Sequence, residues 1–87
     1  MPKRHVVSFF DTTTDERLAI FELLDKIKCA LDAESQPAAY NIGVNDGALA
    51  GQTIMHVHVH LIPRYAGDDS DPRGGVRRIF PKKAKYW

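Results

Sequence analysis

Cysteine is almost absent from this chain, whose 87 residues include Cys29 and no other cysteine. One cysteine excludes a framework of intrachain disulfides, and such scarcity is typical of proteins that fold in a reducing compartment. The amino terminus lacks the apolar core of a signal peptide, and no apolar run approaches the roughly 20 residues that a membrane span requires. We therefore expect a cytoplasmic protein with no membrane partner.

Net charge is also low, at +1, because 12 lysines and arginines nearly balance 11 acidic residues. The chain as a whole is therefore no polycation, and nucleic acid is not expected as its main partner. The positive charges are unevenly placed, however, since six of the 12 basic residues lie between Arg73 and Lys85 and no acidic residue follows Asp71. This basic stretch is either a solvated tail or a rim that attracts anions.

One long helix is predicted over residues 14–34. Thr13 and Glu16 have the spacing of a capping box, which marks the start of a helix. Pro37 disfavours helical geometry at the preceding residue and so ends it. The apolar residues recur with the helical period and form one stripe, made of Ile20, Leu23, Leu24, Ile27, Ala30 and Leu31.

Two main strands are predicted at 39–44 and 53–62, where apolar and polar residues alternate, with turn residues at 45–52 between them. Shorter extended pieces are expected at 5–10 and 76–80. The main strands should form an antiparallel hairpin with the helix packed on its apolar face. Residues 1–87 are thus predicted to form a single α+β domain.

Three of the four histidines stand at alternate positions, His56, His58 and His60. Side chains alternate faces along a strand, so the three imidazoles should point to one side while the valines between them point into the core. Three interpretations are open: a half-exposed polar face, a metal site, or nucleophilic catalysis on phosphorus. Three such positions span roughly 13 Å of strand, and no second cluster of metal ligands completes a site, so a metal is not expected.

Catalysis on phosphorus requires an uncharged nucleophile and donors that stabilise an anion. A neutral imidazole is such a nucleophile near pH 7. The residues before the histidines supply candidate donors, because Asn45, Gln52 and Thr53 carry neutral polar side chains while Gly47 and Gly51 let backbone amides come close to a phosphate. We therefore predict a phosphate cradle that leads into the histidine row.

The segment NDGALAGQTIMHVHVHLIPRYAGD, residues 45–68, closely resembles the signature region of the histidine triad (HIT) family. The family hallmark is three histidines that alternate with apolar residues, preceded by Gly-Gln-Ser/Thr. His56 to Ile62 fits every position of the hallmark, and Gly51, Gln52 and Thr53 fit the element before it. The following "PR" and "AGD", together with "PKRHV" near the amino terminus, are similar to the branch of fragile histidine triad hydrolases and their bacterial relatives.

The resemblance implies a nucleotidyl hydrolase or transferase that cleaves nucleoside monophosphate–X substrates, such as dinucleoside polyphosphates or nucleoside phosphoramidates. His58 would attack the α-phosphorus and form a nucleotidyl-histidine, with His56 and His60 flanking it against the phosphate oxygens. Asn45, Gly51, Gln52 and Thr53 match positions that bind the phosphate or the leaving group. The resemblance implies no required cofactor, Mg²⁺ only as an aid with polyphosphate substrates, and a homodimer.

The chain departs from the family pattern at its amino end. Family members carry several dozen residues before the "PKRHV" equivalent, including strands that line the nucleoside pocket, and His5 is not expected to replace the histidine found there. We therefore interpret the chain as a partial HIT-like domain that lacks the amino-terminal strands. Self-association beyond a dimer and weak catalysis are expected. The alternative functions are a nucleotide-binding or regulatory protein without turnover and an enzyme that removes 5′-adenylate from DNA.

Overall fold

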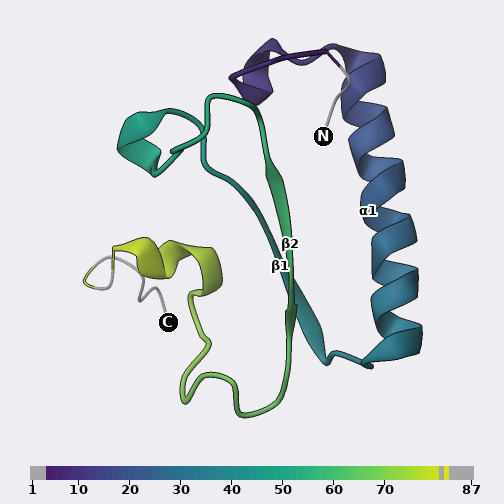
Figure 1. Cartoon of the computed structure of the whole chain (residues 1–87). Helices are drawn as coiled ribbons and strands as arrows, with labels where there is room; N and C mark the ends of the chain where they lie inside the picture. Colours follow the sequence, from purple (N-terminus) through teal and green to yellow (C-terminus); the bar gives the residue numbers. More distant parts are fainter. Residues whose placement is uncertain (1–3, 81, 83–87) are drawn as a thin grey trace.

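The computed structural model describes residues 4–80 and residue 82 (Figure 1). In chain order its elements are η1 (Phe9–Asp11), α1 (Thr14–Glu34), β1 (Ala39–Val44), η2 (Ala48–Ala50), β2 (Val59–Arg64) and η3 (Gly75–Ile79). β1 and β2 form a two-stranded antiparallel sheet. Figure 1 shows α1 on one side of this sheet and η3 on the other. The predicted α+β class, with one long helix on an antiparallel sheet, is confirmed.

The start of α1 is a complete capping box. The Thr13 side chain accepts a hydrogen bond from the Glu16 backbone N–H at 3.1 Å, and Glu16 accepts one from the Thr13 N–H at 2.8 Å. Arg4 adds a salt bridge to the Glu16 carboxylate at 2.8 Å, which ties the incoming chain to the first helical turn. The helix thus begins and ends where the sequence predicts, at 14 and 34.

These contacts make stability depend on acidity. The side-chain hydrogen bond from Arg4, helped by the Thr13 N–H, lowers the pKa of Glu16 from its usual 4.5 to about 2. The unfolded chain therefore takes up a proton near pH 4.5, whereas the folded chain keeps this carboxylate ionised further into acid. The stability that ionised Glu16 contributes is present above pH 4.5 and is lost as the pH falls toward 2.

We expect the thermal unfolding midpoint, followed by circular dichroism, to fall less steeply across this acid window in Glu16→Gln than in the wild type. Glu22→Gln, which removes an exposed carboxylate from the same helix, is the matched control and should follow the wild-type slope. Parallel curves for Glu16→Gln and the wild type would show that the Arg4 contact contributes nothing to stability.

The sheet register is fixed by pairs that run from Ala39 opposite Arg64 to Val44 opposite Val59. At its open end, Tyr40 donates a hydrogen bond to the Asp32 carboxylate at 2.5 Å and so fastens β1 to the last turns of α1. Burial and this acceptor raise the pKa of the Tyr40 hydroxyl to about 12. The predicted strand at 39–44 is confirmed with the same bounds.

Three sequence predictions of extended structure are wrong in detail. The 5–10 segment contains the start of the 3₁₀ helix η1 and no strand. The second strand begins at Val59 and not at 53, because the His56 N–H turns back to the Ile54 carbonyl at 2.8 Å and the Val57 N–H pairs with the Val6 carbonyl at 2.7 Å. Residues 76–79 belong to the 3₁₀ helix η3, and residue 80 follows it. Gly74 and Gly75, which both have positive φ, stand at the start of this helix.

The core is small. Val6, Ile20 and Val57 are buried, and Val57 is the most enclosed, with 1% of its surface exposed. Ile20 is the one buried member of the apolar helix stripe, whereas Leu23 and Ile27 remain 44% and 40% exposed. A two-stranded sheet is too narrow to cover the whole stripe. No helix among the residues that the structure describes is long and apolar enough to cross a membrane.

Candidate active site

His58 is held in a defined tautomer. Its Nδ1 lies 2.7 Å from the carbonyl oxygen of His56. A carbonyl oxygen can only accept, so Nδ1 carries the hydrogen, and in the neutral ring the lone pair is left on Nε2. The contact exists because the chain turns at 54–57 before β2 begins, which brings the His56 carbonyl beside the ring of His58, two residues later.

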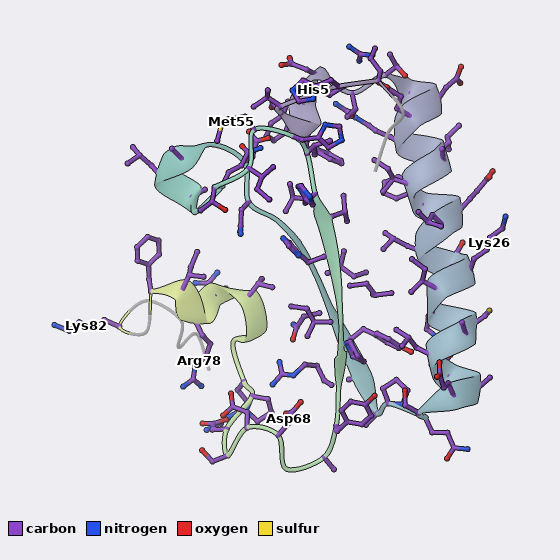
Figure 2. The ribbon with its side chains drawn as sticks, viewed as in Figure 1. His5, Lys26, Met55, Asp68, Arg78 and Lys82 are labelled. Atoms are coloured by element: carbon purple, nitrogen blue, oxygen red, sulfur yellow. The ribbon has the colours of Figure 1, made fainter. Side chains whose placement is uncertain are left out.

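His56 sits between two other imidazoles. Its ring centroid lies 6.0 Å from that of His58, with the rings nearly perpendicular, and 4.9 Å from that of His5. The Nδ1 atoms of His5 and His56 approach to 3.1 Å, so one ring must donate and the other accept. Sequence reasoning placed His5 outside the site. The pairing of Val57 with Val6 brings His5 against His56 at the margin of the site, and Figure 2 shows His5 at the Met55 end of the sheet.

One polar cleft of about 170 Å³ collects the predicted site residues. It is lined by Asn45, Gly51, Gln52, Thr53, Ile54, His56, His58 and His60. Seven of the eight residues that the sequence suggested thus share a single hollow; Gly47 is not in its lining, and Ile54 is the addition. His60 comes from regular strand, while His56 and His58 come from the turned segment before it. The cleft therefore combines three imidazoles with the neutral polar side chains of Asn45, Gln52 and Thr53.

The segment before the histidines is shaped by two glycines and closed by Gln52. Gly47 and Gly51 have φ values of 94° and 98°, which residues other than glycine rarely adopt. The buried Gln52 amide accepts from the Gly47 N–H and donates to the Val7 carbonyl, both at 2.8 Å. Gln52 therefore lines the cleft and also fastens the bend to the amino-terminal segment.

Asp46 is a structural residue that the sequence did not single out. Its carboxylate accepts from the Ser8 hydroxyl at 2.9 Å and from the Phe9 N–H at 2.8 Å. These bonds anchor the bend to Ser8 and Phe9, which lie 38 and 37 positions earlier in the chain. Asp-Gly is a common turn pair, so the local pattern gave no sign of this long-range role.

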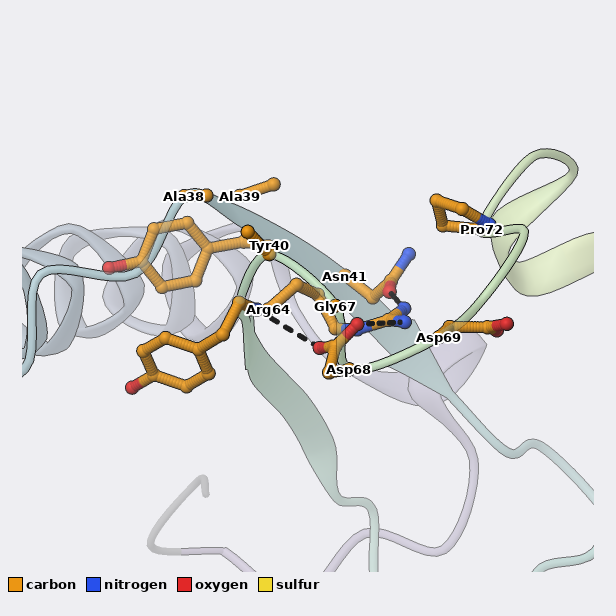
Figure 3. A pocket seen from close by; sticks show the side chains of 11 residues that line it. Ala38, Ala39, Tyr40, Asn41, Arg64, Gly67, Asp68, Asp69 and Pro72 are labelled. Atoms are coloured by element: carbon orange, nitrogen blue, oxygen red, sulfur yellow. Dashed lines mark hydrogen bonds and ion pairs between the residues drawn. The ribbon is translucent and has the colours of Figure 1, made fainter.

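A second hollow, of about 420 Å³, lies at the other end of the hairpin (Figure 3). Arg64 dominates it and makes a two-point contact with the Asp68 carboxylate at 2.9 and 3.1 Å, while also donating to Asn41. The Arg64 hydrogen bonds lower the pKa of Asp68. No histidine lines this hollow. Its one cation, Arg64, is already paired with Asp68, and Asp69 adds a further negative charge, so the smaller histidine cleft is the better candidate for binding a phosphate.

Two arginines of the basic stretch bond to Asp71, which precedes it in the chain. Arg73 contacts the Asp71 carboxylate at 3.0 Å, and Arg78 donates to the Asp71 backbone carbonyl at 2.7 Å. Lys83 and Lys85 lie outside the described residues. Within residues 4–80 and 82, no group of three or more His, Cys, Asp or Glu side chains is arranged to hold a metal ion.

Comparison with known proteins decides the family. A family model described as "HIT domain" matches residues 1–67, which include both the His5 segment and the whole histidine row. The chain belongs to the HIT domain family. Its three alternating histidines are those of the family hallmark.

Several HIT domain relatives are enzymes by name. The chain is 39% identical over 71 residues to the bis(5′-nucleosyl)-tetraphosphatase (asymmetrical) of Schizosaccharomyces pombe, covering 82% of this chain and 39% of that protein. It is 36% identical over 67 residues to the bifunctional bis(5′-adenosyl)-triphosphatase/adenylylsulfatase FHIT of Arabidopsis thaliana, covering 77% and 37%.

Solved structures agree with the HIT domain assignment. The crystal structure of a HIT family protein from Bacillus anthracis superimposes with a TM-score of 0.73 at 42% identity, covering 79% of this chain and 49% of that one. The chain thus spans less than half the length of each of these three proteins. The matching part is the part that carries the histidine cleft.

Proposed function

We propose that the protein is a nucleotide hydrolase that cleaves nucleoside monophosphate–X substrates through a nucleotidyl-histidine at His58. The observation that carries the proposal is the hydrogen bond of His58 Nδ1 to the His56 carbonyl, which leaves the Nε2 lone pair for attack. The named activities of the two enzyme relatives support it, because both act on a nucleoside phosphate joined to a leaving group.

In the first step, the Nε2 lone pair forms a bond to the α-phosphorus while the P–X bond breaks. X departs with the bonding electrons and takes a proton from the solvent. In the second step, a water oxygen attacks the same phosphorus and releases a proton to the solvent, the P–N bond breaks, and its electrons return to Nε2. The sum is nucleoside monophosphate–X plus water giving nucleoside monophosphate and HX, with the enzyme unchanged.

The other cleft residues have supporting roles in this proposal. His56 and His60 flank the nucleophile and contact phosphate oxygens, while Asn45 and Thr53 donate neutral hydrogen bonds to the charge that develops in the transition state. No metal is required for either step. Mg²⁺ would act on polyphosphate leaving groups, where it neutralises charge that the neutral cleft leaves uncompensated.

Product analysis tests the proposal. A dinucleoside polyphosphate, a nucleoside phosphoramidate and a 5′-adenylated DNA are each incubated with the protein, and release of nucleoside monophosphate is followed by chromatography. We expect release from the first two. Saturable binding without release would identify a nucleotide-binding protein, and release from DNA alone, with steep salt dependence, would identify a DNA end-processing enzyme.

We also propose that the protein self-associates. Leu18, Phe21 and Ile27 on α1 are 54%, 52% and 40% exposed, and in the described residues each strand has one neighbour and one unpaired edge. Exposed apolar surface and open strand edges both favour pairing with another chain. We expect sedimentation velocity to give a dimer or a larger species at micromolar concentration. Phe21→Ser should shift the distribution toward monomer, and a wild-type monomer would contradict the proposal.

A further inference from the structure

A third hollow is lined by β1, by His60 and Ile62 of β2, and by Val76 and Ile79 of η3. Figure 1 shows η3 on the side of the sheet away from α1. Its volume is about 490 Å³. Its apolar walls are the side chains of Ile62 from β2 and of Val76 and Ile79 from η3, while Asn41, Gly43 and Asn45 line it from the same face of the sheet. Among the described residues, no lysine, arginine, aspartate or glutamate lines this hollow. The hollow suits an apolar group and not a phosphate.

The apolar walls are open to solvent. Ile62 is 50% exposed, Val76 58% and Ile79 79%. Exposed branched aliphatic side chains gathered around one hollow are unfavourable in water, and their burial under a ligand would recover roughly 25 cal/mol per Å² of apolar surface.

The hollow adjoins the histidine cleft, because His60 and Asn45 line both. The cleft itself, at about 170 Å³, is smaller than the roughly 300–1,000 Å³ of pockets that enclose a drug-sized ligand, whereas the hollow falls within that range. A phosphorus bound at His58 could therefore carry a substituent that passes His60 and enters the hollow.

We infer that this hollow is the leaving-group subsite of the enzyme, and that it selects substrates whose X carries an apolar or aromatic ring. The inference rests on the proposed function. The openness of the hollow favours the leaving group over the nucleoside, because X must escape after the first step while the nucleotidyl group stays bound through both. Asn45, at the junction, can hydrogen-bond a polar atom that links the ring to the phosphorus.

Gly43 offers a direct way to fill the hollow. It lies opposite His60 in the sheet and lines the hollow, and a Cβ built on it meets no atom within 4 Å. Its φ is outside the positive region, so a side chain is compatible with the backbone there. Valine also suits a strand. Gly43→Val should therefore occupy ligand space without clashing with the protein.

The test compares two adenosine 5′-phosphoramidates that differ only in the amine, 2-phenylethylamine or methylamine. These alkylamines have similar basicity, so the chemistry at phosphorus is matched. We expect the wild type to favour the phenylethyl substrate in kcat/KM by at least about tenfold, the discrimination available from burying several apolar carbons. In Gly43→Val this preference should fall about tenfold.

Val76→Asn is a second variant at an exposed position, and it should reduce the preference about threefold by making the wall polar. Leu23→Ala, a change at a 44% exposed apolar position on α1, is the matched control and should keep the wild-type preference.

Three outcomes would overturn the subsite: a wild-type preference near one, an equal loss for both substrates in folded Gly43→Val (which would place the nucleoside in the hollow), or an unchanged preference in both variants. Failure of the proposed function has a different signature, since the wild type would then cleave neither phosphoramidate.

Discussion

His58→Ala is expected to lower kcat/KM for a nucleoside phosphoramidate by at least about a thousandfold. Loss of a covalent nucleophile removes the two-step route altogether, and such losses in other enzymes reach or exceed this size. The half-buried position of His58 makes the change structurally mild. The measurement is initial-rate kinetics, with circular dichroism to show that the variant folds.

The matched control is His60→Ala, which removes an imidazole from the same cleft but leaves the Nδ1 contact of His58 to the His56 carbonyl in place. It should cost less than His58→Ala. Alkaline quench of the wild type during turnover should also trap a nucleotide bound to protein, because phosphorus–imidazole bonds survive alkali better than acid. A His58→Ala rate equal to that of the wild type would end the covalent mechanism.

Val57→Asp is expected to unfold the protein. Val57 is 1% exposed, between the two histidines of the turned segment, and its N–H pairs with Val6. A domain of this size is stabilised by about 4–13 kcal/mol in total. A buried carboxylate without a partner costs several kcal/mol, and the packing of the valine is lost as well. We expect loss of the far-ultraviolet helix signal at 25 °C.

Two further variants separate charge from packing. Val57→Ala should remain folded and lose about 2 kcal/mol in urea unfolding, since it removes methyl groups without introducing a charge. Val59→Asp is the positional control, because Val59 is only half-buried at the start of β2, and it should be tolerated better. Equal stability of Val57→Asp and the wild type would mean that this side chain is not part of the core.

Local patterns predicted the elements whose interactions are local. The capping box of α1 joins residues three positions apart, and the 39–44 strand was marked by simple alternation, so both were placed correctly. The alternation of histidines and valines continued the same pattern through 53–62. There it failed, because the backbone of Val57 pairs with Val6, 51 positions earlier, and the chain turns at Ile54–His56 instead of running straight.

The composition of the cleft was predictable, but its supports were not. Asn45, Gln52, Thr53 and the three histidines are close in sequence, so the sequence placed them together. His5 and Asp46 act across 51 and about 38 residues, and no periodicity reports such separations. The 76–80 segment was also misjudged, since its apolar and basic residues suit a strand while Gly74 and Gly75 impose a helical turn.

The Gln52 amide, which bonds to Gly47 on one side and to Val7 on the other, makes the position of the histidine segment depend on a distant part of the chain. A transplant of residues 45–62 onto another scaffold would carry every reactive group and still misplace them, because the carbonyl that orients the bend would stay behind. A successful transplant would need a surrogate acceptor in the place of residue 7. For protein engineering, the smallest portable unit of this cleft is two separate chain segments held together, and not one contiguous peptide.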